Sequence, residues 1–541
     1  MYRIIRMNQI LKNLSIKLSP LYLIALLIVL GGSVFEIAGA KIEIGSVTVW
    51  AILAIFIYLP MWKRNPHLRS DLTKIYTKFF SFSPNKARIY ILFFIGMSLI
   101  AHLFKHWSFN THGYDISYVY QALFHPFRGP FFPSDFAPSG TALGEHLLFS
   151  LILITPITAF LHSDEFIVLI QHLTVMLGLY YLVFKSFMRN TPQFWAYSAF
   201  LFLSFKTLRA SLVWNFREDI FIFTGLALFI YCIANRYLLR GLIFAILLLI
   251  TKESVCLILP FVAIPIVFDR DLEIKHSKLL AITLVALSGI YFIVGYKFLL
   301  PHFAAGKMTS PFLVRFGDWG NSPSEVVINL ITSPPVWWDA FKRLMAPFNI
   351  KYYLALLLPT LIIIGKNKRA LLWLFPGIMG ILMNAITGYK SQTSMSYHYD
   401  LIVLPFIFTS ISIALIDYRD IFQKRLVWAM IFAVTLSGRW PGFYINKFMI
   451  SSEDLSAQRI VNSLDTKLIA GNRMSAQVNH LKKYTPLRKL SLEEIKASEL
   501  PILITLEEQD SLKIFNQLEH ENYKTTLLHK KKQIILLEPK N

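Results

Sequence analysis

Long apolar runs separated by short polar segments dominate the chain from residue 21 to about residue 440. A helix that spans a membrane needs roughly 20 apolar residues, and fewer where helices are short or packed in a bundle. The pattern therefore predicts an all-α polytopic membrane protein. Its about thirteen predicted spans are 21–39, 45–62, 89–104, 166–184, 192–210, 220–235, 241–251, 254–268, 278–298, 352–365, 370–388, 401–417 and 426–438.

The pattern changes after about residue 440. The segment 451–541 is charged, mixed in sign and free of any run of membrane length. A helical pattern at 454–463 precedes short apolar runs at 467–470 and 500–505, and a final pair of runs at 523–528 and 533–537 indicates a β-hairpin. We predict a small α/β domain over 441–541, a membrane core over 89–440, and an N-terminal pair of spans with a basic loop over 1–88.

Composition supports membrane insertion. Of the 541 residues, 55% are hydrophobic and only 16% are charged, whereas soluble domains carry roughly 25% charged residues. The formal net charge of +22 is typical of the cytoplasmic loops of a polytopic protein. Nucleic-acid binding is not expected, because no basic stripe interleaved with aromatic residues lies on the soluble segment.

Basic loops set the predicted orientation. The loop 63–88 carries many lysines and arginines but a single acid, Asp71, which places it in the cytoplasm together with the N-terminus. The basic turns at 185–189, 236–240, 366–369 and 417–425 agree with this only if the apolar run 147–162 lies at the outer interface without crossing. We therefore expect a multi-pass protein of the cytoplasmic (inner) membrane with an extracytoplasmic C-terminal domain.

This topology places the unusual polar segments on one side of the membrane, the extracytoplasmic side. Ionisable residues at membrane depth are costly, so each is a candidate for function. The segments are 105–146, 214–219, 252–253, 299–351 and 389–400.

The first outer loop, 105–146, contributes three candidates. Asp115 follows a His-rich and aromatic stretch at the start of a predicted interfacial helix. It is either a general base or metal ligand, or an ordinary surface acid or helix N-cap. Glu145 and His146 precede an apolar helix, where a histidine either packs and hydrogen-bonds or donates to a phosphate.

The other polar segments contribute charges with little loop to solvate them. Arg217, Glu218 and Asp219 form either a self-neutralising cluster or a site in which Arg217 faces a phosphate. Lys252 and Glu253 interrupt an apolar stretch, where Lys252 either snorkels to the interface or attracts an anionic head group.

Two histidines and a pair of tryptophans complete the candidates. His302 in loop 299–351 and His398 before the span 401–417 lie on the same predicted side. Trp337 and Trp338 are typical of an aromatic belt at a membrane interface.

Several classes of protein are disfavoured. The two cysteines, Cys232 and Cys256, lie in apolar runs, so neither a disulfide framework nor a cysteine metal site is indicated. No Walker loop, dinucleotide fingerprint, zincin motif or nucleophile elbow occurs, which argues against an ATP-driven pump and a classical serine or zinc hydrolase.

The ordered motifs over about 105–420 resemble a family of bacterial and archaeal polytopic proteins known only as predicted membrane proteins of unknown function. That family is similar in turn to the GT-C superfamily of glycosyltransferases, which use lipid-phosphate-linked sugars. The motifs are Tyr114-Asp115, Glu145-His146, Asn215-Phe216-Arg217-Glu218, Lys252-Glu253, Pro301-His302-Phe303 and Tyr397-His398-Tyr399.

The resemblance implies a glycosyltransferase with Asp115 as its base, since GT-C enzymes carry an essential Asp on the first large outer loop. The implied partners are a lipid-phosphate-linked sugar and membrane lipid. Here Asp115 lacks an adjoining acid, and Arg217 stands where relatives often carry His, so no cofactor is expected and metal binding is not supported. The alternatives are a transporter or lipid-carrier flippase, which would tend to show internal repeats that are not apparent here, and a non-catalytic scaffold.

Overall fold

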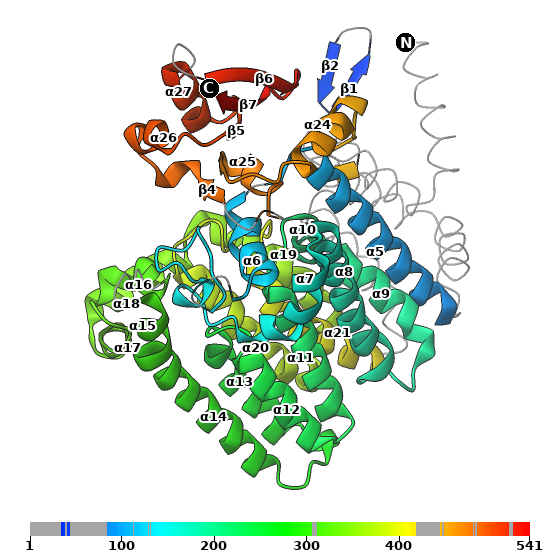
Figure 1. Ribbon diagram of the computed structural model, residues 1–541. Helices are drawn as coiled ribbons and strands as arrows, with labels where there is room; N and C mark the ends of the chain where they lie inside the picture. The colour runs from blue at the N-terminus through cyan, green and yellow to red at the C-terminus, as the bar shows by residue number, and fades with distance from the viewer. Residues whose placement is uncertain are drawn as a thin grey trace, which may run out of the picture.

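The computed structural model (Figure 1) describes most of the chain from residue 84 onward. For 34–37, 40–43, 113–115, 193, 311–312, 323 and 488 it describes the backbone only. The described residues are 34–37, 40–43, 84–111, 113–127, 129, 131–305, 311–417, 444–445, 448–479, 481, 484–518 and 523–540.

A bundle of apolar helices forms the body of the described chain. Five helical segments are long and apolar enough to cross a membrane: α5 (Pro84–Trp107), α8 (Asp164–Tyr180) with η3 (Tyr181–Lys185), α14 (Ser277–Val294) with η6 (Gly295–Leu299) and α15 (Leu300–Ala304), α19 (Pro347–Ile364) and α20 (Lys368–Ile386). Five shorter apolar helices accompany them: α9 (Trp195–Ser204), α11 (Asp219–Ala234), α12 (Leu238–Leu249), α13 (Val255–Phe268) and α21 (Leu404–Asp417). The chain is therefore a mostly helical membrane protein, as predicted.

The predicted total of about thirteen spans is not confirmed. The helices above occupy the predicted spans between 89 and 417, whereas 45–62 and 426–438 lie outside the described residues. The span predicted at 21–39 is wrong at its end, because Val34–Ile37 form strand β1, paired antiparallel with β2 (Ala40–Glu43).

Helix α11 lies at the centre of the bundle. Its sequence is apolar on every side, and its residues are buried except for one half-buried stripe that runs from Phe221 to Ala234. The central position matters for function, because it carries the charged residues at the helix N-terminus, Glu218 and Asp219, into a buried environment.

The basic turns gather at one end of the bundle. Arg236, after α11, pairs with Glu273, after α13, at 2.5 Å, and Arg369, in the first turn of α20, pairs with Asp269 at 2.9 Å. Asn367 donates to Asp417 at the end of α21. These contacts join three of the connections that the charge pattern assigned to one side, together with the connection between α13 and α14.

The segment 147–162 stays at the opposite end. It forms η2 (Phe149–Leu153) and the short α7 (Thr155–Leu161). The Nε2 atom of His106, in the last turn of α5, lies 3.5 Å from Oδ2 of Asp164, in the first turn of α8. The chain therefore leaves α5 and enters α8 at the same end of the bundle, as expected for a segment that does not cross.

Shorter elements cover this end. They are α6 (Gly113–Phe124), η1 (Ala142–Gly144), α10 (Lys206–Val213), α16 (Pro311–Phe316), η7 (Gly317–Trp319), α17 (Pro323–Thr332), α18 (Pro334–Leu344) and η8 (Tyr399–Ile402). Two other short elements, η4 (Pro192–Phe194) and η5 (Arg270–Leu272), belong to the basic end.

A small five-stranded sheet follows near the C-terminus, in the order β4-β3-β5-β7-β6. The predicted hairpin is confirmed, because β6 and β7 pair antiparallel. Strand β3 is parallel to β4 and β5, and β5 is antiparallel to β7. The elements are α24 (Ser452–Asn462), β3 (Leu468–Ala470), α25 (Asn472–Ser475), β4 (Tyr484–Pro486), η9 (Leu487–Lys489), α26 (Leu492–Ser498), β5 (Ile502–Thr505), α27 (Gln509–Leu518), β6 (Tyr523–His529) and β7 (Ile534–Pro539).

The C-terminal sheet and its helices sit on the end of the bundle that carries α6 (Figure 1). Gln477 donates to the carbonyl oxygen of His106 at 3.1 Å and to Oγ1 of Thr111 at 3.2 Å. Lys532 donates to the carbonyl oxygen of Ser108 at 2.6 Å. These bonds attach the C-terminal part directly to the connection between α5 and α6.

Candidate functional site

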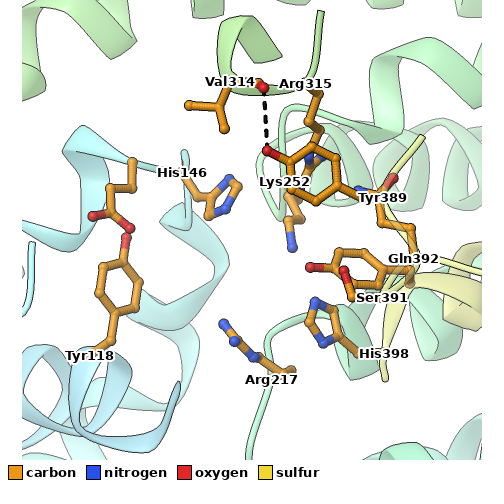
Figure 2. Close-up of a pocket in the computed structure, with 12 residues that line it drawn as sticks. Tyr118, His146, Arg217, Lys252, Val314, Arg315, Tyr389, Ser391, Gln392 and His398 are labelled. Atoms are coloured by element: carbon orange, nitrogen blue, oxygen red, sulfur yellow. Dashed lines mark hydrogen bonds between the residues drawn. The ribbon is translucent and has the colours of Figure 1, made fainter. Parts of the chain in front are cut away.

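A cavity of about 360 Å³ opens at the end of the bundle that carries α6 (Figure 2). Each of the five polar segments that were predicted to share one side contributes at least one residue to it. The lining residues are Tyr118, Glu145, His146, Arg217, Lys252, Val314, Arg315, Tyr389, Ser391, Gln392, His398 and Tyr399.

Lys252 forms the buried centre of the site. It lies in the turn between α12 and α13, and its ammonium group donates to Oε1 of Glu218 at 2.8 Å and to Oδ2 of Asp219 at 2.9 Å. Burial alone would lower the pKa of Lys252, but the two carboxylates outweigh it and raise the pKa above its usual value. Two of the three ammonium donors are thus used by carboxylates, and the third is available to a ligand in the cavity.

Glu218 and Asp219 occupy the start of α11, where the helix dipole favours negative charge. Burial would raise the pKa of Glu218, but Lys252 and Arg217 lower it below its usual value, so the carboxylate stays ionised. Of the two alternatives that the sequence left open, the self-neutralising cluster is thus partly correct. Glu218 and Asp219 neutralise Lys252, while Arg217 faces the cavity.

Glu253 holds His146. The Nδ1 atom of His146 lies 2.7 Å from Oε1 of Glu253, and the backbone N–H of Leu147 donates to Oε2 of Glu253 at 3.1 Å. Burial would raise the pKa of Glu253, but the neighbouring His146 outweighs it and the pKa falls to about 2. The pair links the first outer loop to the α12–α13 turn.

His398 lies across the cavity from His146 in a different environment. Its Nε2 atom is 3.5 Å from Oδ2 of Asp219, and its buried Nδ1 atom has no hydrogen-bond partner among the described residues. Burial lowers the pKa of His398 well below its usual value, and the charges of Arg217 and Lys252 lower it further. His398 is therefore a neutral imidazole.

Asp400 fixes the segment that presents His398. Its buried carboxylate accepts hydrogen bonds from Thr207 on α10 at 2.9 Å, from Asn384 on α20 at 3.1 Å and from the hydroxyl of Tyr352 on α19. Three helices thereby hold the first turn of η8 in place, which sets the position of the side chains just before it.

The cavity lining is cationic. Arg217, Lys252 and Arg315 carry positive charge, whereas Glu145 is the single carboxylate among the lining residues. The carbonyl oxygen of Arg315 accepts from Arg343 at 3.1 Å, and the hydroxyl of Tyr389 donates to the carbonyl oxygen of Val314 at 3.4 Å, the dashed line in Figure 2. Guanidinium and ammonium groups around a cavity with tyrosine walls suit an anionic ligand such as a phosphate.

Of the predicted site residues, Glu218 and Glu253 lie behind the lining, bonded to Lys252 and His146, and two others are not placed at the cavity. The side chain of Asp115 lies outside the described residues. Its backbone belongs to α6, one helical turn before Tyr118, which lines the cavity, so both positions share one face of the helix. His302 on α15 is exposed and is not a lining residue; its ring lies against Phe303.

The sequence did not single out several lining residues. Tyr118 stands in the first outer loop without a motif of its own, and only the tertiary structure brings it to the cavity. Arg315 is one of the charges that the sequence offers in loop 299–351, without a predicted role. Tyr389, Ser391 and Gln392 lie in the polar segment before the span 401–417, and Tyr399 belongs to the motif Tyr397-His398-Tyr399.

No group of three or more histidine, cysteine, aspartate or glutamate side chains that could hold a metal ion occurs within the described part of the chain. Glu218, Asp219 and Glu253, which lie next to the cavity lining, are already bonded to Lys252 and His146.

Comparison with known proteins gives a family and two structural similarities. The family described as "Predicted membrane protein (DUF2079)" matches residues 105–478. None of the curated proteins matches significantly. Two crystal structures of ArnT from Cupriavidus metallidurans are similar to the chain. The one bound to undecaprenyl phosphate has a TM-score of 0.47 and 10% identity, over 83% of this chain and 97% of that one. The apo form has a TM-score of 0.46 and 9% identity, over 83% and 98%.

Proposed function

The chain belongs to the DUF2079 family of predicted membrane proteins, and we propose that it is a membrane glycosyltransferase. In this proposal it transfers a sugar from a polyprenyl-phosphate carrier to an extracytoplasmic acceptor. The observation that carries the proposal is the cationic cavity, in which Arg217, Lys252 and Arg315 face a single lining carboxylate, Glu145.

The chemistry requires positive charge at the carrier phosphate. When the bond between the sugar and the phosphate oxygen breaks, negative charge develops on the departing phosphate, and fixed cations stabilise it. Arg217 can bind two phosphate oxygens at once through its planar guanidinium group, whereas Lys252 acts as a point charge. Glu218 and Asp219 hold Lys252 at 2.8 and 2.9 Å, so this charge does not need to reorganise during the reaction.

The size and position of the cavity support a head group as the ligand. A volume of about 360 Å³ lies at the lower end of the range for small-molecule sites, roughly 300–1,000 Å³. The cavity lies where apolar helices end, so a carrier could keep its polyprenyl chain in the bilayer while its phosphate and sugar enter the cavity. On the charge pattern of the loops, this end is extracytoplasmic.

Asp115 is the proposed base. It would accept the proton of the acceptor hydroxyl as that oxygen attacks the sugar. Support comes from its place one helical turn before Tyr118 and from the resemblance of its family to the GT-C superfamily, in which an essential Asp lies on the first large outer loop. We propose no cofactor, because Arg217, Lys252 and Arg315 can supply the positive charge at the phosphate.

The test is a complementation experiment in cells that lack the gene. The variant Asp115→Asn keeps the size of the side chain but removes the base, so it should express and insert normally while the cell-envelope glycan stays as in the deletion strain. Glycan restored to the wild-type level by this variant would refute the assignment of Asp115. A carrier that moves across the membrane without any loss of sugar would favour the flippase instead.

A further inference from the structure

A buried lysine outside the cavity holds the stretch of chain that carries Arg217. We propose that this lysine, Lys105, is a positioning residue that keeps the guanidinium group of Arg217 directed at the carrier phosphate. The inference rests on the proposed function, in which Arg217 binds that phosphate. Lys105 is not one of the lining residues, so it acts on the ligand only through the chain that it holds.

Lys105 is bonded to the two residues that shortly precede Arg217. It lies in the last turn of α5 and is only 4% exposed. Its ammonium group donates to the carbonyl oxygen of Trp214 at 3.2 Å and to Oδ1 of Asn215 at 3.0 Å. The ammonium nitrogen also lies 4.5 Å from the centre of the Trp214 ring, within the range of a cation–π contact. One side chain therefore fixes two consecutive residues.

The connection between α10 and α11 depends on side chains from neighbouring spans. Residues 214–218, all of them described, form neither helix nor strand, and carbonyl groups at the end of a helix lack partners within that helix. Buried donors from α5 and α8 satisfy them: Nδ1 of His102 donates to the carbonyl oxygen of Leu212 at 2.9 Å, and Nε2 of Gln171 donates to the same oxygen at 3.2 Å. Lys105 continues this set of donors past the end of α10.

Arg217 thus lies between two anchored neighbours. On one side, Lys105 holds Asn215. On the other side, Glu218 accepts from Lys252 at 2.8 Å. Because both neighbours are fixed, the backbone that carries Arg217 has little freedom, and Figure 2 shows its side chain among the other lining residues. A guanidinium group that is already in place loses less conformational freedom when a phosphate binds.

Loss of the anchor should weaken binding through Arg217. The variant Lys105→Met keeps a long side chain but removes the donors, so that Arg217 has to be ordered when the phosphate binds. Ordering one flexible side chain lowers an affinity by roughly twofold to tenfold. The variant Lys105→Arg keeps both the charge and the donors, and it should retain most of the affinity.

The test is a double-mutant cycle on the affinity of the purified full-length protein in detergent for farnesyl phosphate, a short prenyl phosphate. With Arg217 present, Lys105→Met should lower the affinity by roughly twofold to tenfold. In the Arg217→Gln background the same change should have almost no effect, because the group that Lys105 positions is gone. A lysine that only stabilised the fold would give the same loss in both backgrounds, and that result would overturn the inference.

A second variant separates position from charge. Asn215→Ala removes one acceptor of Lys105 and leaves every charge in place, so it also carries the test if Lys105→Met does not fold. It should lower the affinity when Arg217 is present and have almost no effect in Arg217→Gln. An affinity of Asn215→Ala equal to that of the wild type would mean that Lys105 acts through its charge, and the inference would be wrong.

Lys532→Met is the matched control. Lys532 also donates to a backbone carbonyl close to the end of α5, that of Ser108 at 2.6 Å, but its bond attaches the C-terminal sheet. Its loss should therefore show no coupling to Arg217→Gln, and coupling as large as that of Lys105→Met would contradict the inference.

The two levels of the argument fail in different ways. If the wild type binds farnesyl phosphate and Arg217→Gln weakens the binding, but Lys105 and Arg217 are not coupled, only the inference is wrong. If the wild type binds no farnesyl phosphate, the proposed function fails and the inference fails with it.

Discussion

Replacing Lys252 by methionine should be the most damaging single change near the cavity. The substitution keeps a long side chain but removes the ammonium group, and it leaves the buried carboxyl groups of Glu218 and Asp219 without their partner. In the structure these carboxylates lie 2.8 and 2.9 Å from the ammonium nitrogen, and their side chains are 1% and 9% exposed.

The magnitude follows from this geometry. At an effective dielectric constant of about 20, a pair of unit charges at such a distance attracts by roughly 6 kcal/mol, most of which offsets the cost of burying the charges. Removing one partner from a buried pair costs roughly 3–5 kcal/mol, because the remaining charge is left uncompensated. We expect Lys252→Met to lose about this much free energy of unfolding, and Lys252→Arg to lose less, because it keeps the charge.

The assay is denaturant unfolding in mixed micelles, monitored by tryptophan fluorescence. The unfolding free energies of the wild type and the variants are compared as a mutant cycle. The triple variant Glu218→Gln/Asp219→Asn/Lys252→Met removes all three charges and should recover most of the lost stability. Arg369→Met is a control at the opposite end of the bundle, where Arg369 pairs with Asp269 at 2.9 Å. It should destabilise the protein but leave the affinity for farnesyl phosphate unchanged, whereas Lys252→Met should lower both. An unfolding free energy of Lys252→Met within about 1 kcal/mol of the wild type would refute the reasoning, since a buried unpaired charge cannot be that cheap.

Three further changes test other parts of the structure. Arg217→Gln should weaken binding of farnesyl phosphate by roughly tenfold to a hundredfold, measured by titration, whereas His302→Ala should leave it unchanged because His302 is exposed outside the cavity lining. Gln477→Ala should reduce the unfolding free energy by roughly 1–3 kcal/mol, because it leaves the carbonyl of His106 and the hydroxyl of Thr111 without this donor. Burial would raise the pKa of Asp454, but its bonds to Lys532 and Ser451 lower it below its usual value. The stabilisation by Asp454 is therefore present above about pH 4 and is lost as the pH falls through the lowered pKa. The stability difference between the wild type and Asp454→Asn should accordingly be large at neutral pH and vanish in acid; a constant difference would contradict the assignment.

Hydrophobic patterning predicted the helical membrane core between residues 89 and 417 because a span requires a long apolar run wherever it packs. It failed at 34–37, since a short apolar stretch of β-branched and aromatic residues, here Val34–Ile37, can also form a strand. The hairpin near the C-terminus was predictable because β6 and β7 pair with each other, so the signal is local in the chain.

The composition of the cavity was only partly predictable. Charge asymmetry in the loops grouped the polar segments on one side, and each of the five segments then proved to contribute to one cavity. Sequence could not decide which of the histidines belongs to it, and His302, which stands in a similar aromatic context to His398, is exposed. Arg315 could be noted only as one charge of a long loop, because that loop has no periodicity that fixes where a side chain points.

By itself, then, the sequence determined that the chain inserts into a membrane, because insertion follows from the transfer free energy of long apolar runs. It also predicted that the unusual charges gather at one end, because the charge asymmetry of the loops orients the spans. The tertiary structure decided which charges neutralise each other and which face a ligand. Lys252, in the turn between α12 and α13, is bonded to Glu218 and Asp219 at the start of α11. Glu253 holds His146, which lies more than a hundred residues away in the chain. Such pairings depend on distances of a few ångströms between segments remote in the chain, and no pattern along the sequence encodes them.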